Sequence, residues 1–392
     1  MSKLNSVTAV EGDYLVYATS NYSGESQLMV FDPAKENHTQ ILSGWDIRGI
    51  SMSPNGDLAL SISHKNNLEI YIMNSPFPDS IPENIASDIT THYRMVWSPD
   101  GRFLAYTPLQ VGETSLWIWD GVRSYQIAHS PAGIGDISWS PDGKLAFVVF
   151  DTSSYRDEGD PSEAFIWDGE TVVNLSQNPT GEDRFPTWNV DGRLAFISER
   201  EEIYDVFIWD GISMMNGVPD VSTFKNIAPY LTDYNSTPAW TNSGSITFSG
   251  SDISDNGFVQ IYEWDGVNAV NLSQNPNSHN GGQRWRNDGH WSFHTYWSSE
   301  QLVYIRDETN ETQLTLEGYG ARWSESGYFI LCQRTLSGTH WRFQEWKIPE
   351  LIREYEGWTL LMGNGSKIIE VAQGDSIHAT WSNGEAASCV DW

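Results

Sequence analysis

One segment of about 50 residues recurs along this chain, and its clearest copy begins at Trp139. The copy opens with Trp-Ser-Pro-Asp-Gly at 139–143, and an apolar run follows at 145–150. It continues through Phe-Ile-Trp-Asp-Gly at 165–169, and the opening recurs as Trp-Asn-Val-Asp-Gly at 188–192. Because most of the chain can be written as copies of this segment, we expect a fold built from one repeated unit.

Each repeat predicts four short strands joined by turns. Pro presets the first turn dihedral, Asp can bond the backbone beyond it, and Gly accepts a positive φ, so Ser-Pro-Asp-Gly predicts a tight turn. Asp168-Gly169 is a strong hairpin signal, and no part of the unit shows helical periodicity. The unit therefore predicts an antiparallel meander. Its strands are expected at 137–139, 145–150, 164–167 and 172–175.

The glycine of the first turn marks the spacing of the repeats. Successive marker glycines lie 38 to 57 residues apart, by subtraction of their sequence numbers. Units of roughly 40–50 residues with four strands each are typical of β-propeller blades. One such sheet cannot bury both of its faces, so we expect a single all-β propeller over residues 1–392, with the units stacked around an axis. The marker glycines are Gly12, Gly56, Gly101, Gly143, Gly192, Gly244, Gly289, Gly327 and Gly384.

A direct count of these units predicts eight blades of four antiparallel strands. Seven is the alternative, if the short seventh unit or the irregular first copy does not form a blade of its own. The chain ends on half a unit, in which a strand at 386–390 follows a turn. Because an exposed strand edge is a liability, we expect this strand to pair with N-terminal strand residues and so close the ring.

The repeated motifs resemble the TolB-type, WD-like propeller repeat family. The resemblance rests on Ser-Pro-Asp-Gly-Lys-Leu-Ala-Phe at 140–147 and Ile-Trp-Asp-Gly at 166–169, and it covers the second to sixth units best. Such repeats occur in bacterial envelope proteins and in the propeller domains of prolyl-oligopeptidase-type peptidases. The resemblance implies a propeller that serves as a scaffold, a peptide binder or an enzyme accessory domain. The envelope proteins also carry a signal peptide and an N-terminal α/β domain, and this sequence shows neither pattern.

Composition narrows the choice of partner and compartment. The formal net charge of −30 argues against nucleic acid and anionic membranes as partners. No stretch is apolar enough to span a membrane, so we expect a cytoplasmic protein, or a periplasmic or secreted one whose signal was removed. Most of the 19 Trp end a first or third strand and are expected to pack between blades. Cys332 and Cys389 fit no metal or redox spacing and are expected to be buried thiols.

Two connections are longer than the tight turns elsewhere. Residues 211–225 and 348–366 are both expected to join the third strand of a unit to its fourth, which would place them on one face. The second contains the segment 351–355, which we interpret as a short helical insertion. Long loops are often functional. Their apolar residues predict a contact surface for a partner or a neighbouring blade: Met214, Met215, Trp358, Leu360 and Leu361.

No motif in the sequence points to catalysis. There is no Gly-x-Ser-x-Gly nucleophile elbow, and the segment 374–378 resembles a serine-hydrolase block only superficially. The acidic loops at 157–160 and 252–256 lack the ligand spacing of a calcium motif, and we interpret them as solvated loops. The nine His show no zinc-site spacing. We therefore assign no catalytic residue, no metal and no cofactor.

The few arginines are placed unevenly along the repeats. Five of them lie within four residues before the landmark Trp or Met that ends the first strand of a unit. In a propeller that strand lines the central channel, so these arginines would gather near one channel mouth. Arg suits carboxylate and phosphate recognition. The five are Arg48, Arg94, Arg184, Arg284 and Arg322.

An alternative is that each of these arginines pairs with a nearby acid such as Asp46 or Asp183. The alternation of side chains along a strand also argues against a simple ring of arginines. Arg48 and Arg184 lie an even number of residues before the landmark residue, and the other three lie an odd number before it, so the two sets are expected on opposite faces of their strands. We nevertheless predict a site for an acidic or carboxylate-ended ligand at the mouth. Its residues are Arg48, Arg94, Arg184, Tyr93, Asp136 and Tyr234.

Two classes of function fit these observations. The first is a non-enzymatic binding or scaffold propeller, which recognises a protein, peptide or ligand through one face and the channel mouth. The second is a propeller enzyme, such as a lyase, cyclase or hydrolase, with its active site on the axis. Because the sequence lacks clustered histidines and a recognisable nucleophile, we favour the first class. We expect a protein or peptide partner, no nucleic acid and no membrane insertion.

Overall fold

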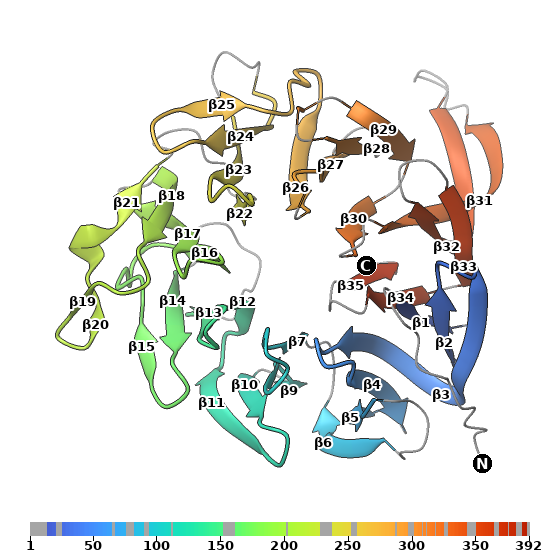
Figure 1. The fold of residues 1–392 in the computed structure, drawn as a ribbon, viewed down its shortest axis with the longest axis horizontal. Coiled ribbons are helices and arrows are strands. Elements are labelled where there is room, and N and C mark those ends of the chain that lie inside the picture. Colours follow the sequence, from blue (N-terminus) through green and yellow to red (C-terminus); the bar gives the residue numbers. More distant parts are fainter. Residues whose placement is uncertain are drawn as a thin grey trace.

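The strands surround a central axis in the computed structural model of the chain, and each sheet runs outward from that axis (Figure 1). The regular structure is almost entirely β, as the repeats predict, and the one helix among the described residues is the short 3-10 turn η1 (Val221–Thr223). In the same residues, no helix is long and apolar enough to cross a membrane. The described residues are 14–20, 26–64, 67–75, 82–89, 94–110, 113–151, 161–200, 203–227, 237–251, 257–286, 288–296, 302–307, 309–310, 312–317, 319–324, 328–342, 350–363, 368–374, 376–381 and 386–389.

Hydrogen bonding groups the described strands into seven large sheets, numbered here in chain order. Sheet 1 contains β35 (Ala386–Cys389), β34 (Ser376–Trp381), β1 (Leu15–Ser20), β2 (Ser26–Asp32), β3 (Asn37–Met52), β4 (Leu58–His64), β5 (Asn67–Met73) and β6 (Glu83–Ile89), in that spatial order. Sheet 2 contains β7 (Met95–Trp97), β8 (Leu104–Tyr106), β9 (Leu109–Gln110), β10 (Glu113–Trp119) and β11 (Ser124–Ser130). Sheet 3 contains β12 (Ile134–Trp139), β13 (Leu145–Phe150), β14 (Ser162–Trp167) and β15 (Val172–Asn174).

The remaining sheets follow the same four-stranded antiparallel plan. Sheet 4 contains β16 (Asp183–Trp188), β17 (Leu194–Arg200), β18 (Ile203–Trp209) and β21 (Lys225–Asn226), with the small hairpin β19 (Met214–Met215) and β20 (Val218–Pro219) inserted before β21. Sheet 5 contains β22 (Ala239–Trp240), β23 (Ile246–Gly250), β24 (Gln260–Trp264) and β25 (Ala269–Asn271). Sheet 6 contains β26 (His279–Trp285), β27 (Trp291–Tyr296), β28 (Leu302–Arg306) and β29 (Thr312–Glu317). Sheet 7 contains β30 (Tyr319–Trp323), β31 (Phe329–Arg342), β32 (Glu350–Gly363) and β33 (Ile368–Gly374).

The long strand β3 explains how eight sequence units fit into seven sheets. Its residues 37–45 pair with β2, and its residues 46–52 pair with β4. β3 thus runs from the outer edge of one unit to the axis side of the next (Figure 1). Seven hydrogen-bonded sheets correspond to the alternative count from the sequence, and sheet 1 contains two of the units that the direct count of eight separates.

The turns form as their residues predict. In sheet 3, Gly143 has a φ of 87°, and its N–H donates to the carbonyl of Ser140 at 3.1 Å. The Ser140 hydroxyl oxygen accepts the N–H of Lys144 at 2.7 Å. In the hairpin that follows β14, Oδ1 of Asp168 accepts the N–H of Thr171 at 2.7 Å. These local bonds fix where each strand ends, and the four predicted strands of this unit are confirmed to within a few residues.

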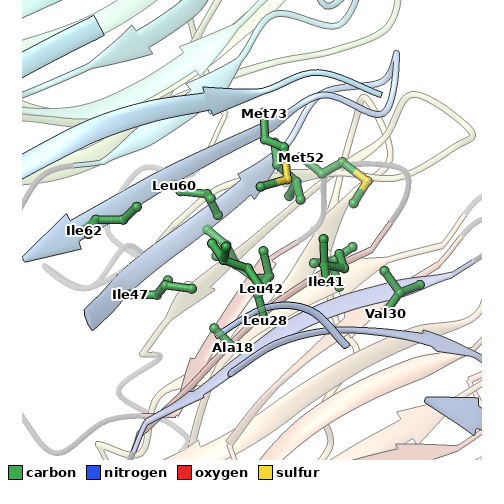
Figure 2. Close-up of a cluster of buried hydrophobic side chains, with 13 residues drawn as sticks. Ala18, Leu28, Val30, Ile41, Leu42, Ile47, Met52, Leu60, Ile62 and Met73 are labelled. Carbon is green, nitrogen blue, oxygen red and sulfur yellow. The ribbon is translucent and has the colours of Figure 1, made fainter. Parts of the chain in front are cut away.

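Apolar layers between units hold the ring together. The cluster in Figure 2 gathers side chains from both halves of sheet 1, including Leu28 on β2, Leu42 on β3 and Leu60 on β4, each no more than 1% exposed. Indole groups add a recurring bond between neighbouring sheets. Nε1 of Trp139 donates to the carbonyl of Val96 at 3.0 Å, and equivalent bonds join β7 to β3 and β22 to β16. The predicted packing role of the tryptophans is therefore confirmed where they are described as buried.

The two ends of the chain meet in sheet 1. β1 pairs with β34 along its whole length, from Leu15 opposite Trp381 to Ser20 opposite Ser376. The predicted sharing of one sheet by N- and C-terminal strands is confirmed. The predicted direct partner is wrong, because β34 lies between β1 and β35. β34 ends in Trp381 at the first-strand position of a unit, so β1 follows it as the second strand and β35 is left on the axis side (Figure 1).

Two further expectations need correction. Cys332, on β31, is disulfide-bonded rather than a free thiol, and the only other cysteine of the chain is Cys389, on β35. The segment 348–366 is not a connection between third and fourth strands, because most of it is β32, which pairs with β31 as far as Arg342 opposite Glu350. The extension thus lies between the second and third strands, and 351–355 is strand rather than helix.

The residues of the predicted apolar contact surface do not lie together, because some are exposed and others belong to the core. Met214 and Met215, on the β19–β20 hairpin, are 50% and 52% exposed and stay a predicted contact surface. Leu360 is 0% exposed and belongs to the core of sheets 1 and 7. The side chain of Trp358 lies outside the described ones.

Candidate binding site at the channel mouth

A bulge in the first strand of sheets 3 and 4 positions the candidate side chains. In β12 the pairing register shifts between Gly135 and Ser138, and a matching shift occurs in β16. Asp136 and Phe185 lie inside these bulges with φ values of 49° and 53°, which non-glycine residues seldom adopt. A bulge redirects the side chains around it, so the simple two-residue alternation of a strand does not hold there.

Arg184 is the centre of the candidate site. Its Nε donates to Oδ2 of Asp136 at 2.9 Å, and its Nη1 donates to Oε1 of Glu182 at 2.9 Å. Its guanidinium lies 5.0 Å and 4.9 Å from the ring centroids of Phe150 and Phe185. Burial alone would lower the pKa of Arg184, but Asp136 and Glu182 raise it above its ordinary value. Arg184 is therefore a fixed cation that ties sheet 4 to sheet 3.

Arg94 approaches the same carboxylate from sheet 2. Its Nη1 lies 4.0 Å from Oδ1 of Asp136, and its side chain is 59% exposed. The Asp136 and Glu182 side chains are only 6% and 3% exposed, and the Tyr204 hydroxyl donates to Glu182 at 2.8 Å. Two carboxylates thus balance two guanidiniums, and the guanidinium of Arg94 is the charged group of this cluster that a ligand can reach.

The structure brings together three of the six predicted site residues, namely Arg94, Asp136 and Arg184. Arg48 has the local partner that the sequence offered as an alternative, because its Nη2 lies 2.8 Å from Oδ2 of Asp46. Tyr93 and Tyr234 lie outside the described residues.

Asp183 lies next to this cluster in the chain but is closed off from solvent. Its exposed fraction is 0%, and neither carboxylate oxygen has a partner at good hydrogen-bond geometry among the described residues, although the side chains of Ser198, Ser176 and Asn178 lie close enough to lower its pKa. Burial raises the pKa of Asp183 to about 7, against the opposing effects of Ser198, Ser176 and Arg200. A carboxyl with such a pKa suits proton transfer near neutral pH, but this one is closed off from any group outside the protein interior. We therefore assign Asp183 a structural role.

Sequence reasoning missed Glu182 and Tyr204. The local signal for Glu182 was its place two residues before Arg184, since alternate residues of a strand share a face. Tyr204 comes from β18, 22 residues away from Glu182 in the chain, and left no local signal. Within the described ranges no group of three or more His, Cys, Asp or Glu is arranged to hold a metal ion. The acidic loops at 157–160 and 252–256 fall outside those ranges.

Comparison with known proteins supports the fold. No family model matches the sequence, and no curated protein matches it. Among solved structures, the chain is similar to the β-propeller domain of the Trilobed protease from Pyrococcus furiosus, whose topology is described as open velcro. The identity is 16% and the TM-score is 0.51, over 83% of this chain and 97% of that one.

Two other solved structures are similar to the chain. Prolyl oligopeptidase B from Galerina marginata matches at 10% identity and a TM-score of 0.55, over 83% of this chain and 50% of that one. TolB from Acinetobacter baumannii matches at 13% identity and a TM-score of 0.39, over 76% of this chain and 78% of that one. The chain thus spans half the length of the prolyl oligopeptidase. At these identities the likeness shows the β-propeller fold alone.

Proposed function

We propose that this chain is a non-enzymatic recognition propeller, which binds a protein or peptide partner through the mouth of its channel. The observation that carries the proposal is the meeting of Arg94, Asp136 and Arg184, which come from three neighbouring sheets. The packing of the three sheets against one another fixes the relative positions of these side chains. Binding residues are commonly carried by such a rigid scaffold.

Arg94 is the residue that contacts the ligand in this proposal. Arg184 is held by two carboxylates at 2.9 Å, whereas Arg94 has one distant contact at 4.0 Å and an exposed side chain. A guanidinium offers five N–H donors, so Arg94 can form a bidentate pair with a ligand carboxylate. Asp136, which Arg184 holds in place, attracts the guanidinium of Arg94.

Arg48 supplies a second cation for the same ligand. The Arg48 and Asp46 side chains are 52% and 22% exposed, and exposed ion pairs contribute only about 0–1 kcal/mol. A bidentate ligand carboxylate can therefore compete with Asp46. Tyr93 and Tyr234 remain in the proposed site on the strength of the sequence, as hydroxyl donors from neighbouring connections.

Calorimetric titration with peptides tests this proposal. Short acidic peptides, each with a free or an amidated C-terminus, are titrated into the wild-type protein and Arg94→Gln. We expect Arg94→Gln to weaken the tightest binder about tenfold or more, because charge-assisted hydrogen bonds are lost. Arg123→Gln is the matched control, since Arg123 is 79% exposed and pairs with Asp120 in the β10–β11 turn. Undiminished binding by Arg94→Gln, or no binding of any peptide to the wild type, contradicts the proposed site.

A second candidate function is favoured by the similarity to a peptidase and to the propeller domain of a protease. In this alternative the propeller is itself an enzyme, such as a hydrolase, or it accompanies an enzyme. In either case the channel mouth would bind the substrate of that enzyme. Hydrolysis of fluorogenic peptides by the purified protein separates the two candidates. Turnover that stays with the protein through a second purification supports the enzyme, and its absence leaves the recognition role.

The disulfide at Cys332 supports an oxidising compartment. Disulfides persist in the periplasm and outside the cell and are rare in a reducing cytosol. Of the two expectations from the sequence, we therefore propose the periplasmic or secreted location. Peptide mapping of the protein from its own cell, under non-reducing conditions, checks this. Free thiols at both Cys332 and Cys389 would contradict it.

A further inference from the structure

A histidine of sheet 6 occupies a space that only glycine leaves open. The bulge of β26 lies between Gly281 and Arg284, and Gly281 is the cross-strand partner of His294 on β27. Gly282, inside the bulge, has a φ of 66°, and a Cβ built there would fall 2.1 Å from Cε1 of His294. The absence of a side chain at Gly282 therefore lets the imidazole rest against the first strand of its sheet.

Arg284 borders the same bulge, opposite Ser292 of β27, and has no acidic partner in the part of the chain that the structure describes. Its side chain is half-buried, and its Nη1 donates to the carbonyl of Gln283 at 2.9 Å. Partly buried charges are usually paired. Because the chain has 52 acidic residues, most of its arginines are expected to pair with an acidic side chain, and Arg284 differs from this expectation. The remaining N–H donors of Arg284 point to a ligand that brings its own acceptor.

Arg322, on β30 of sheet 7, adds a second positive charge at the same place. Burial, and then the charges of Arg284 and Arg322, lower the pKa of His294 to about 4. The imidazole is therefore neutral at neutral pH and still carries one N–H donor. β26 and β27 both contact β30. Nitrogen donors from three strands thus gather between sheets 6 and 7.

We propose that Arg284, His294 and Arg322 form a second binding site, which takes an oxyanion: the carboxylate of a peptide or a phosphate group. Guanidiniums bind either group in a bidentate manner, and the imidazole N–H adds a directed bond. The site lies on β26, β27 and β30, on a different arc of the ring from β12 and β16 (Figure 1). It stands independently of the function proposed for Arg94.

Titration of the whole chain with inorganic phosphate, and with a tripeptide in free-acid and amidated forms, tests this site. We expect at least one free anion to bind, and Arg284→Gln to weaken it about tenfold or more. Arg123→Gln is the control and should keep the wild-type affinity. Binding of phosphate alone identifies a phosphate group as the ligand. Binding of the tripeptide that is lost on amidation identifies a carboxylate.

A second readout uses the wild-type protein and therefore does not depend on how a variant folds. A bound anion favours the imidazolium, so the pKa of His294 should rise from about 4 when phosphate or peptide is added. Among the described residues, the charged groups that face this imidazole are Arg284 and Arg322. NMR resonances that are missing in His294→Gln identify the ring. No binding of any probe at millimolar concentration, wild-type affinity in Arg284→Gln, or an unchanged pKa of His294 overturns the proposal.

Discussion

Asp183 couples the stability of the protein to pH, because its carboxyl is fully buried at the start of β16. Its pKa is raised from 3.8 to about 7, mainly by burial. The folded state therefore holds this proton more tightly than the unfolded state. The resulting stabilisation is complete below about pH 4 and is lost progressively as the pH rises to about 7.

We expect Asp183→Asn to remove this dependence, which amounts to about 1.4 kcal/mol per pH unit within that window. The variant should melt above the wild type at and above neutral pH, where the wild type must bury a charge. Thermal unfolding from pH 4 to pH 8 measures the effect, with Asp191→Asn as control because the Asp191 side chain is 46% exposed. Parallel pH profiles for the wild type and Asp183→Asn would show that Asp183 does not titrate as described.

Three of the six side chains that the sequence grouped together lie close to one another in the structure, but most of their partners were not predicted. Arg94 and Arg184 were found from their spacing before the landmark residue, Asp136 was added from a neighbouring connection between units, and the three side chains do meet. Parity placed Arg94 and Arg184 on opposite sides, yet both reach Asp136, because the bulges shift the register in β12 and β16. The positive-φ positions inside these bulges are Asp136 and Phe185 rather than glycines, so a count of alternating positions could not include the bulges.

The strand β34 carries the junction between the two ends of the chain. β34 pairs with β1 over six residue pairs, whereas β35 pairs only with β34 among the described strands. Removing residues 376–392 therefore opens the edge of β1, and removing 386–392 leaves the β1–β34 pairing in place. The smaller deletion also removes Cys389.

We expect deletion of 376–392 to unfold the protein or lower its melting temperature sharply, and deletion of 386–392 to lower it much less. Cys332→Ser in the full chain is the control for the disulfide, because it leaves both strands present. Calorimetric melting of the four proteins makes the comparison. If the longer deletion melts like the wild type, the β1–β34 pairing does not hold the ring.

Strands were predicted correctly where a turn sequence such as Ser-Pro-Asp-Gly or Asp-Gly marks the end of a strand. The run 145–150 is the strand β13 to the residue, because Ser-Pro-Asp-Gly ends just before it. The β31–β32 extension was missed, since no Ser-Pro-Asp-Gly or Asp-Gly sequence marks the reversal between them. Its strands are set by pairing with each other, and the segment 351–355 could be assigned to a strand only once its partner on β31 was known.

At the scale of the whole molecule, the spacing of the marker glycines was enough to predict an all-β propeller. The number of blades was harder to predict, because β3 continues without a break from one unit into the next. A sequence shows where a unit repeats, but hydrogen bonds decide which units share a sheet. The proposed ligand left the weakest signal in the sequence, because the proposed site uses a few side chains whereas the fold uses all of the repeats.

The most direct test of the proposed function is a crystal structure of the protein with its tightest free-acid peptide. We expect a peptide carboxylate within hydrogen-bond distance of the Arg94 guanidinium, with Arg184 still bonded to Asp136 and Glu182. A peptide bound at the outer edges of the sheets, with Arg94 free of contact, would contradict a recognition site at the channel mouth.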